Sequence, residues 1–270
     1  MLVKALRTSQ QNVRFSHGGR DGAILAIMET SSGTMRTLLL VLVQNALLLV
    51  ATVVVFWAGV FVLNRLGFGR GYGLSPLGFA RPEGGFPAGI GLGVLVGVGA
   101  ILVSFPVNLL SVWVLELAGR PVDSTSQEPL MRGIESWISE SPLTAIVASF
   151  LIVGLVGPAV EELVFRGVLF NGLYRLGRAV GGRVLSDETS RKAAGRVMLM
   201  LSVVVTSAFF ASLHLDPAIF LAIFILAVSL CVLYVRTGSL IPSIVAHATF
   251  NSLTVAILAL SGLGVFPTSV

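Results

Sequence analysis

Six long apolar segments, separated by short polar connections, make up most of the sequence. A transmembrane helix needs about 20 consecutive, mostly apolar residues, and each segment approaches or exceeds that length. The segments are residues 37–63, 86–117, 142–174, 197–213, 218–235 and 240–260. The third is long enough to be kinked or broken near Gly157 and Pro158, since proline is a frequent cause of kinks. The pattern predicts an all-α, polytopic membrane helical bundle of about six transmembrane helices.

The polar connection at residues 120–141 contains a short amphipathic pattern. One helical face would carry four apolar side chains, Leu130, Ile134, Trp137 and Ile138. This helix either lies at the membrane interface, anchored by Trp137, or is a plain connecting helix with one apolar side.

Other connections carry local signals. Asp216 and Pro217 are typical of an N-cap and a first-turn proline, and Gly238 follows the fifth span. Residues 175–196 hold six Lys and Arg residues and predict a basic loop. We expect this loop and the connections that hold Arg81 and Arg236 to share one side of the membrane. Several glycines of the second span, from Gly89 to Gly99, would permit close helix approach.

The composition agrees with a membrane protein. The chain of 270 residues is 55% hydrophobic and only 11% charged, whereas soluble domains are about 25% charged. Mean hydropathy is +0.93. The net charge of +5 fits an excess of Lys and Arg in cytoplasmic loops, and no long basic tract indicates nucleic-acid binding. The single cysteine, Cys231, excludes an intramolecular disulfide. We expect a multi-pass protein of the cell membrane whose partners include the lipid bilayer and no nucleic acid.

The first 34 residues are polar and mildly basic, and their apolar patch at 23–28 is too short for a signal-peptide core. We therefore expect the first span to act as an uncleaved anchor. Within one membrane domain, three parts are predicted. They are a polar tail at 1–36, N-terminal spans with the interfacial helix at 37–142, and a core that carries the chemistry at 143–262.

Two adjacent acids and an arginine lie inside the third apolar segment. Glu162 and Arg166 are four residues apart, so they share a helical face with the acid N-terminal, the better order for an ion pair. Glu161 points about 100° away from that pair. Ionisable residues at bilayer depth are expensive and usually functional. The alternative is an ion cluster that serves packing only, although packing does not require the second acid.

Two of the three histidines also lie in or at the ends of apolar segments. His214 follows Phe210 by four residues, and His247 precedes Asn251 by four, which places an imidazole and an amide on one face. A lone histidine is more often a satisfied core residue, but two such positions together with Glu161 weaken that alternative. At about 1.5 Å rise per residue, His214 and His247 lie roughly 25 Å and 10 Å from the basic side of the membrane. We therefore expect these groups to form a polar site between helices.

Three motifs in this order resemble those of a known family. EELVFRG, FFASLH and HATFN resemble the EExxxR, FxxxH and HxxxN motifs of the CPBP family. These proteins are intramembrane CAAX-type prenyl endopeptidases with bacteriocin-processing or immunity relatives, also called Abi proteins. The resemblance covers about residues 143–260, and the basic segment at 175–196 lengthens the gap between the first two motifs.

The resemblance implies a glutamate-dependent intramembrane protease. Glu161 with His214 would activate a water molecule, and His247 with Asn251 would stabilise the oxyanion, a large catalytic effect in a dry site. The electrostatic support or substrate contacts would come from Glu162, Arg166 and Phe210. The substrate would be a membrane-associated peptide or protein. A prenylated C-terminal peptide is the family's best-known target, and a leader peptide or a membrane-tethered regulator is an alternative.

A metal is not required by this mechanism, and we favour none. If a divalent metal such as zinc were bound, Glu161, His214 and His247 would supply three ligands with an open fourth position, although no HExxH motif is present.

Two other classes of function compete with the protease. A non-catalytic membrane scaffold or bacteriocin-immunity protein of the same fold would keep the polar cluster for structure alone. A proton-coupled transporter also uses buried Glu and His, but transporters often show paired halves with broken helices, and no such pairing is visible here.

Overall fold

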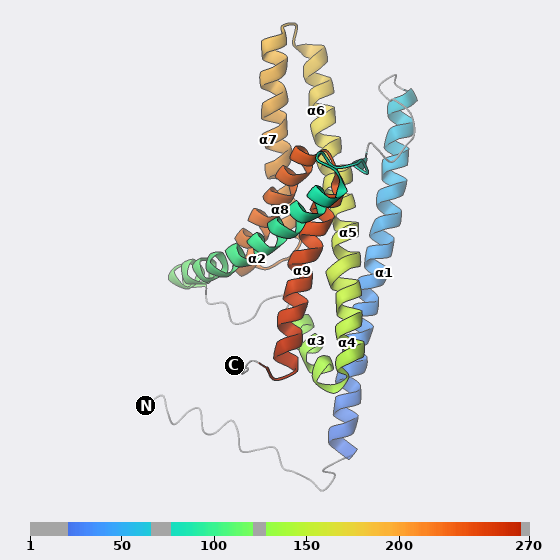
Figure 1. Ribbon diagram of the computed structural model, residues 1–270. Coiled ribbons are helices and arrows are strands. Elements are labelled where there is room, and N and C mark those ends of the chain that lie inside the picture. Colours follow the sequence, from blue (N-terminus) through green and yellow to red (C-terminus); the bar gives the residue numbers. More distant parts are fainter. Residues whose placement is uncertain (1–20, 66–76, 121–127, 266–270) are drawn as a thin grey trace.

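The structure is a computed structural model that describes residues 21–65, 77–120 and 128–265, and within these ranges the chain is helical with turns and no strand. Figure 1 shows the arrangement of the helices. The elements in chain order are α1 (Asp21–Arg65), α2 (Phe86–Leu117), α3 (Glu128–Glu140), α4 (Pro142–Ser149), η2 (Phe150–Val156), α5 (Gly157–Glu162), η3 (Leu163–Phe170), α6 (Asn171–Val184), α7 (Glu188–Ser212), α8 (Pro217–Thr237) and α9 (Leu240–Gly262).

Six of the helical segments are long and apolar enough to cross a membrane, which confirms the expected helical bundle and a multi-pass integral membrane protein. They are Met35–Val62, Phe86–Leu117, Pro142–Val184, Glu188–Ser212, Pro217–Thr237 and Leu240–Gly262. Helix α1 begins at Asp21, so the second half of the expected polar tail is helical, while residues 1–20 lie outside the described residues.

The third span is one continuous helical segment, Pro142–Val184, and is not broken at Pro158. Two π-helical segments, η2 and η3, flank the α-helical turn of α5. The backbone N–H of Gly157 donates to Ile152 O, five residues back, directly before the proline that lacks an N–H. The wider turns therefore absorb the proline within one uninterrupted helix.

The predicted basic loop at 175–196 is wrong, because most of it is helical. Helix α6 continues to Val184, α7 begins at Glu188, and only three residues connect them. The two helices form a hairpin that projects beyond the other spans (Figure 1). At Gly177 they pass so closely that a Cβ would collide with Met198. Asp187 caps α7 by accepting from Ser190 N at 2.7 Å, and the hydrogen bonds from the backbone and side chain of Ser190 lower the pKa of Asp187.

Helix α3 forms as expected, and its apolar face is packed against the bundle. Ile134, Trp137 and Ile138 are buried in one cluster with Leu38 of α1 and Ala259 of α9. Trp137 is only 6% exposed, too little for an interfacial anchor. The structure thus favours the plain connecting helix of the two alternatives.

Helix α2 packs against α9 through glycines spaced by four. A Cβ on Gly93 would lie 2.7 Å from Pro242 O, and one on Gly97 would lie 2.5 Å from Ala246 O. Gly91 and Gly99 face open space. Only one face of α2 therefore uses its glycines for close approach.

The ends of α8 confirm both local predictions. Asp216 accepts from Ala218 N at 3.0 Å with Pro217 in the first turn, and Gly238 ends the helix with a φ of 61°. Next to that end, Glu83 N donates to Thr237 O at 2.9 Å and Ser239 Oγ donates to Ala80 O at 2.7 Å. The connection that holds Arg81 and the last turn of α8, which holds Arg236, therefore lie at the same end of the bundle, as expected.

Candidate active site

A chain of three buried ionisable side chains joins the third and sixth spans. Oε1 of Glu162 lies 2.7 Å from Nη1 of Arg166 and 2.9 Å from Nδ1 of His247. Glu162, Arg166 and His247 are 0%, 1% and 3% exposed. Because a guanidinium only donates, Glu162 accepts from Arg166, and the same oxygen is then placed to accept from the imidazole.

Arg166 is held by more than its ion pair. Its Nη2 donates to Ala227 O of α8 at 3.0 Å, and its guanidinium carbon lies 4.9 Å from the ring centroid of Phe210. Buried charges are tolerated only when their hydrogen-bonding capacity is well used and partners compensate them. Carboxylate, carbonyl and aromatic face together supply part of that compensation from three helices, while Nε of Arg166 and Oε2 of Glu162 are buried without a hydrogen-bond partner among the described residues.

Glu161 lies on the other side of His247 and is the more accessible acid. Its side chain is 31% exposed, and its Oε2 lies 3.8 Å from Nε2 of His247. This distance is too long for a direct hydrogen bond, and polar groups so separated are commonly bridged by a water molecule. The two nitrogens of His247 thus face two different glutamates.

Phe210 connects the second histidine to this cluster. The ring centroid of Phe210 lies 5.1 Å from that of His214 and 5.7 Å from that of His247, both edge-on. His214 Nδ1 lies 3.1 Å from Phe210 O. A carbonyl can only accept, so Nδ1 carries the hydrogen and Nε2 is the acceptor nitrogen of the neutral ring.

Asn251 lies one turn beyond His247 on α9 and is half-buried. Its Nδ2 donates to Val153 O of η2 at 3.0 Å. An amide nitrogen carries two hydrogens, so this bond fixes the side chain and leaves a second donor on the same nitrogen.

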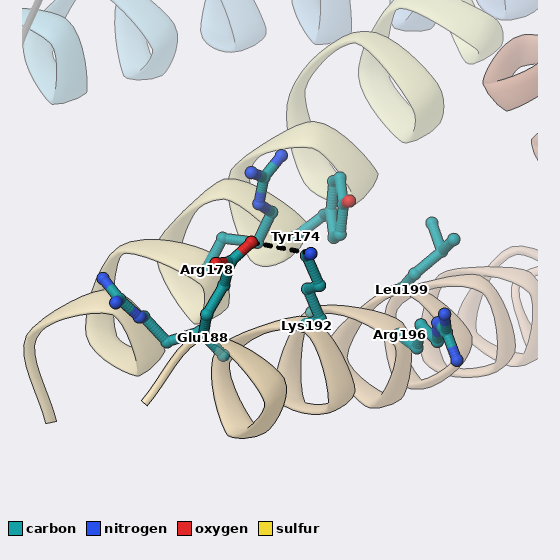
Figure 2. A pocket seen from close by; sticks show the side chains of 8 residues that line it. Tyr174, Arg178, Glu188, Lys192, Arg196 and Leu199 are labelled. Carbon is teal, nitrogen blue, oxygen red and sulfur yellow. Dashed lines mark ion pairs between the residues drawn. The ribbon is translucent and has the colours of Figure 1, made fainter. Parts of the chain in front are cut away.

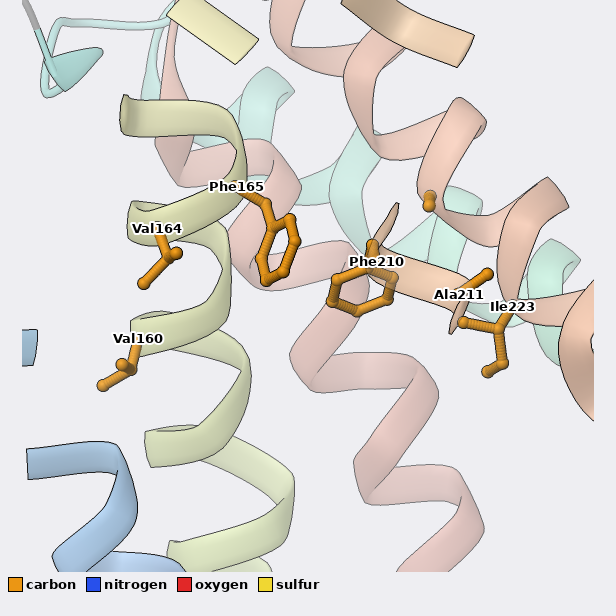
Figure 3. Close-up of a cluster of buried hydrophobic side chains, with 7 residues drawn as sticks. Val160, Val164, Phe165, Phe210, Ala211 and Ile223 are labelled. Carbon is orange, nitrogen blue, oxygen red and sulfur yellow. The ribbon is translucent and has the colours of Figure 1, made fainter. Parts of the chain in front are cut away.

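An apolar cluster flanks the polar groups. It contains Val160, Val164, Phe165, Phe210, Ala211, Ile223 and Ala227. Figure 3 shows Phe165 directed toward Phe210, and their centroids are 4.8 Å apart. Such surroundings exclude bulk water and strengthen the electrostatic interactions inside.

The structure brings together most, but not all, of the expected site residues by direct contact. Glu162, Arg166, His247 and Phe210 contact one another, and Glu161 faces His247. His214 joins them through Phe210. Sequence reasoning missed Ala227, which contributes a backbone carbonyl, and a carbonyl leaves no signal in residue type or spacing.

The geometry does not support the metal site that would form if Glu161, His214 and His247 were ligands. Among the residues that the structure describes, no three His, Cys, Asp or Glu side chains are grouped so that they could hold a metal ion. Glu161, His214 and His247 do not fit such a centre, and no chemical step is routed through a metal below.

Comparison with known proteins agrees with the motifs. Residues 143–253 match the family model of the Rce1-like proteins, described as type II CAAX prenyl endopeptidase Rce1-like. The expected resemblance to CAAX-type intramembrane proteases is confirmed over this segment, which contains every site residue named above. Searches of curated proteins and of solved structures give no significant match.

Proposed function

We propose that this protein is an intramembrane endopeptidase that hydrolyses a peptide bond of a membrane-associated substrate. One observation carries the proposal. A fully buried Glu162–Arg166 pair also binds Nδ1 of His247, so that its Nε2 faces a second, partly exposed glutamate. An ion pair that served packing alone would need neither Glu161 nor the imidazole.

Glu161 is the general base of the proposed reaction. Its carboxylate takes a proton from a water molecule, and the water oxygen forms a bond to the peptide carbonyl carbon. The carbon–nitrogen bond then breaks, and the leaving amine receives the proton from Glu161. The partial exposure of Glu161 supports this role, because water and substrate must reach the base.

His214 assists by holding the water. Its Nδ1 donates to Phe210 O, which leaves Nε2 as the acceptor nitrogen of the neutral ring. Phe210 lies between the two imidazoles and positions both.

His247 and Asn251 stabilise the oxyanion of the tetrahedral intermediate. When His247 is protonated on both nitrogens, Nδ1 donates to Glu162 and Nε2 donates to the oxyanion. The second N–H of Asn251 is available for the same purpose, since the first binds Val153 O. Donors fixed before the reaction lower its barrier because they need no reorganisation.

The substrate we propose is a prenylated, CAAX-type C-terminal peptide, with a leader peptide or membrane-tethered regulator as alternatives. Glu162 and Arg166 support the site electrostatically in this scheme. Their complete burial favours that role over direct contact with the carboxyl end of the substrate.

Replacing the base tests the proposal. The full-length protein is reconstituted in liposomes with a fluorogenic farnesylated peptide, and the cleavage rate is compared with that of Glu161→Gln. We expect at least about a 100-fold loss, since general base catalysis contributes roughly 10²–10⁴-fold.

The matched control is Glu116→Gln, which removes an exposed carboxylate at the end of α2 and should leave the rate unchanged. Full activity in Glu161→Gln would exclude this mechanism. Wild-type protein that cleaves neither the farnesylated peptide nor unprenylated membrane peptides would favour the scaffold.

A further inference from the structure

The helical hairpin of α6 and α7 contains a cleft that is separate from the candidate active site. The cleft has a volume of about 580 Å³, and its lining includes Tyr174, Arg178, Glu188, Arg191, Lys192 and Arg196. Figure 2 shows that the lining side chains come from both helices, with Lys192 directed from α7 toward α6. The lining of the cleft therefore contains four cationic side chains and one carboxylate.

That carboxylate is already engaged. Glu188 Oε1 lies 2.6 Å from Lys192 Nζ, as drawn in Figure 2. Within the described part of the chain, no carboxylate lies within ion-pair distance of Arg178, Arg191 or Arg196. Arg178 lies against the Tyr174 ring, 5.7 Å from its centroid. Arg191 donates to Asp187 O at 3.4 Å and to Ser186 O at 3.3 Å, and these neutral carbonyls do not cancel its charge. Within the described residues, three arginines thus give the cleft a positive charge that no carboxylate compensates.

The cleft lies where the spans change from apolar to basic. Gly177 of α6 faces Met198 of α7, and Gly181 faces Ala194, which sets the antiparallel register. In this register the basic residues of both helices begin within roughly one helical turn of each other. A helical segment of 43 residues is about 64 Å long, about twice the hydrocarbon thickness. The apolar run of the fourth span begins at Val197, directly after Arg196, so we place the cleft at the level of the lipid headgroups.

The surroundings of the cleft are those of a lipid contact. Exposed apolar side chains follow the same two helices, and include Leu176, Val180, Val197 and Met200. Arginine binds phosphate with two parallel hydrogen bonds, and clusters of cations beside a span are typical of anionic lipid sites. The arginines are suited to bind a lipid phosphate, and the neighbouring apolar side chains are suited to contact its acyl chains.

We propose that the α6–α7 cleft binds the phosphate of an anionic phospholipid headgroup through Arg178, Arg191 and Arg196. This binding site is independent of the proposed peptidase activity. The lipid would tie the hairpin to the membrane surface beside the third and fourth spans.

Lipid binding to the full-length protein tests the site. Native mass spectrometry of the detergent-solubilised protein measures its affinity for phosphatidylglycerol and phosphatidylcholine. We expect wild type to prefer phosphatidylglycerol. The variant with Arg178→Gln, Arg191→Gln and Arg196→Gln should lose at least about tenfold in that affinity, because one cation near an anionic lipid contributes about fivefold.

Two controls distinguish binding in the cleft from a nonspecific effect of the protein's positive charge on lipid affinity. The variant with Arg65→Gln, Arg81→Gln and Arg236→Gln removes three exposed cations from the same end of the bundle, and it should retain wild-type affinity within about threefold. Lysine at the three cleft positions should also retain most binding. If the glutamine variant does not fold, Arg196→Gln alone should show about a fivefold loss.

Three results would overturn the proposal. One is an equal loss of affinity for phosphatidylglycerol in the cleft variant and in the control variant with glutamine at Arg65, Arg81 and Arg236. Another is equal binding of phosphatidylcholine and phosphatidylglycerol. The third is binding of inorganic phosphate as tight as that of the lipid, which would assign the cleft to soluble phosphate compounds.

Discussion

Arg166 is the residue on which the buried polar chain depends. It neutralises Glu162, donates to Ala227 O and lies over the Phe210 ring. Removing one member of a buried ion pair leaves the other charge without compensation, and this typically costs 3–5 kcal/mol. Glu162 then loses the partner that holds it in position against His247. The stability of the fold and the orientation of the imidazole are therefore linked at this side chain.

Arg166→Met should lower the free energy of unfolding by about 3–5 kcal/mol, measured by denaturation of the purified protein in detergent. Because uncompensated Glu162 causes most of this loss, the double variant Glu162→Gln with Arg166→Met should recover part of it. A double variant as unstable as Arg166→Met would show that packing, and not charge, causes the effect.

The matched comparison is Arg132→Met. Arg132 also pairs with a glutamate four residues earlier, Glu128, but its side chain is 65% exposed. Exposed pairs contribute about 0–1 kcal/mol, so this variant should unfold almost as wild type does. An equal loss in Arg132→Met and Arg166→Met would contradict the role of burial.

At the scale of elements, two features of helix geometry position the site. The acidic turn of α5 lies between the π-helical segments η2 and η3, and π-turns inside helices occur often at functional sites. Helix α9 carries His247, and the glycines of α2 let the backbone of α2 approach α9 directly beside that residue. A side chain at this contact has no space.

Gly97→Ala should destabilise the bundle by about 1–3 kcal/mol, the usual cost of overpacking, because its Cβ would meet Ala246 O at 2.5 Å. Gly99→Ala lies on the same helix and faces open space, so it should be neutral or slightly stabilising. Thermal unfolding of both variants in one detergent measures the difference. Equal melting temperatures would contradict the close α2–α9 contact.

At the scale of the whole molecule, the sequence predicts the spans well and singles out the polar groups that the structure places near one another. The limits of α2 and α9 follow from hydropathy alone, because the lipid interior tolerates few polar groups. Glu161, Glu162, His214 and His247 stand out for the same reason. That these groups act as proposed remains a prediction, as does the division of the chain at residues 36 and 142.

The sequence predicts the structure less well where helices pack against each other than where they face lipid. The polar residues of 175–196 predict a loop, but Gly177 and Gly181 let α6 and α7 pack together as a hairpin. The residue type of Trp137 favours the membrane interface, but α1 and α9 cover its side chain. Tertiary packing decides both cases, and residue type alone does not encode it.

The fold also predicts which connections share a side of the membrane. Ser186→Cys in the hairpin and Glu83→Cys beside α8 should react with an impermeant maleimide from one side of sealed vesicles, and Ser139→Cys of α3 from the other. The natural Cys231 is 1% exposed and should not interfere. Labelling of Ser186→Cys and Glu83→Cys from opposite sides would contradict the arrangement of the spans.

The glycine contact between α2 and α9 has a mechanical consequence. Helices adapt to bilayers of different thickness by tilting, and the contacts of Gly93 and Gly97 with backbone carbonyls of α9 leave no compressible side chain between the two helices. We therefore expect the two helices to tilt together. Because α9 carries His247, the length of the surrounding acyl chains should change the orientation of that imidazole relative to Glu161 and Glu162 of the third span.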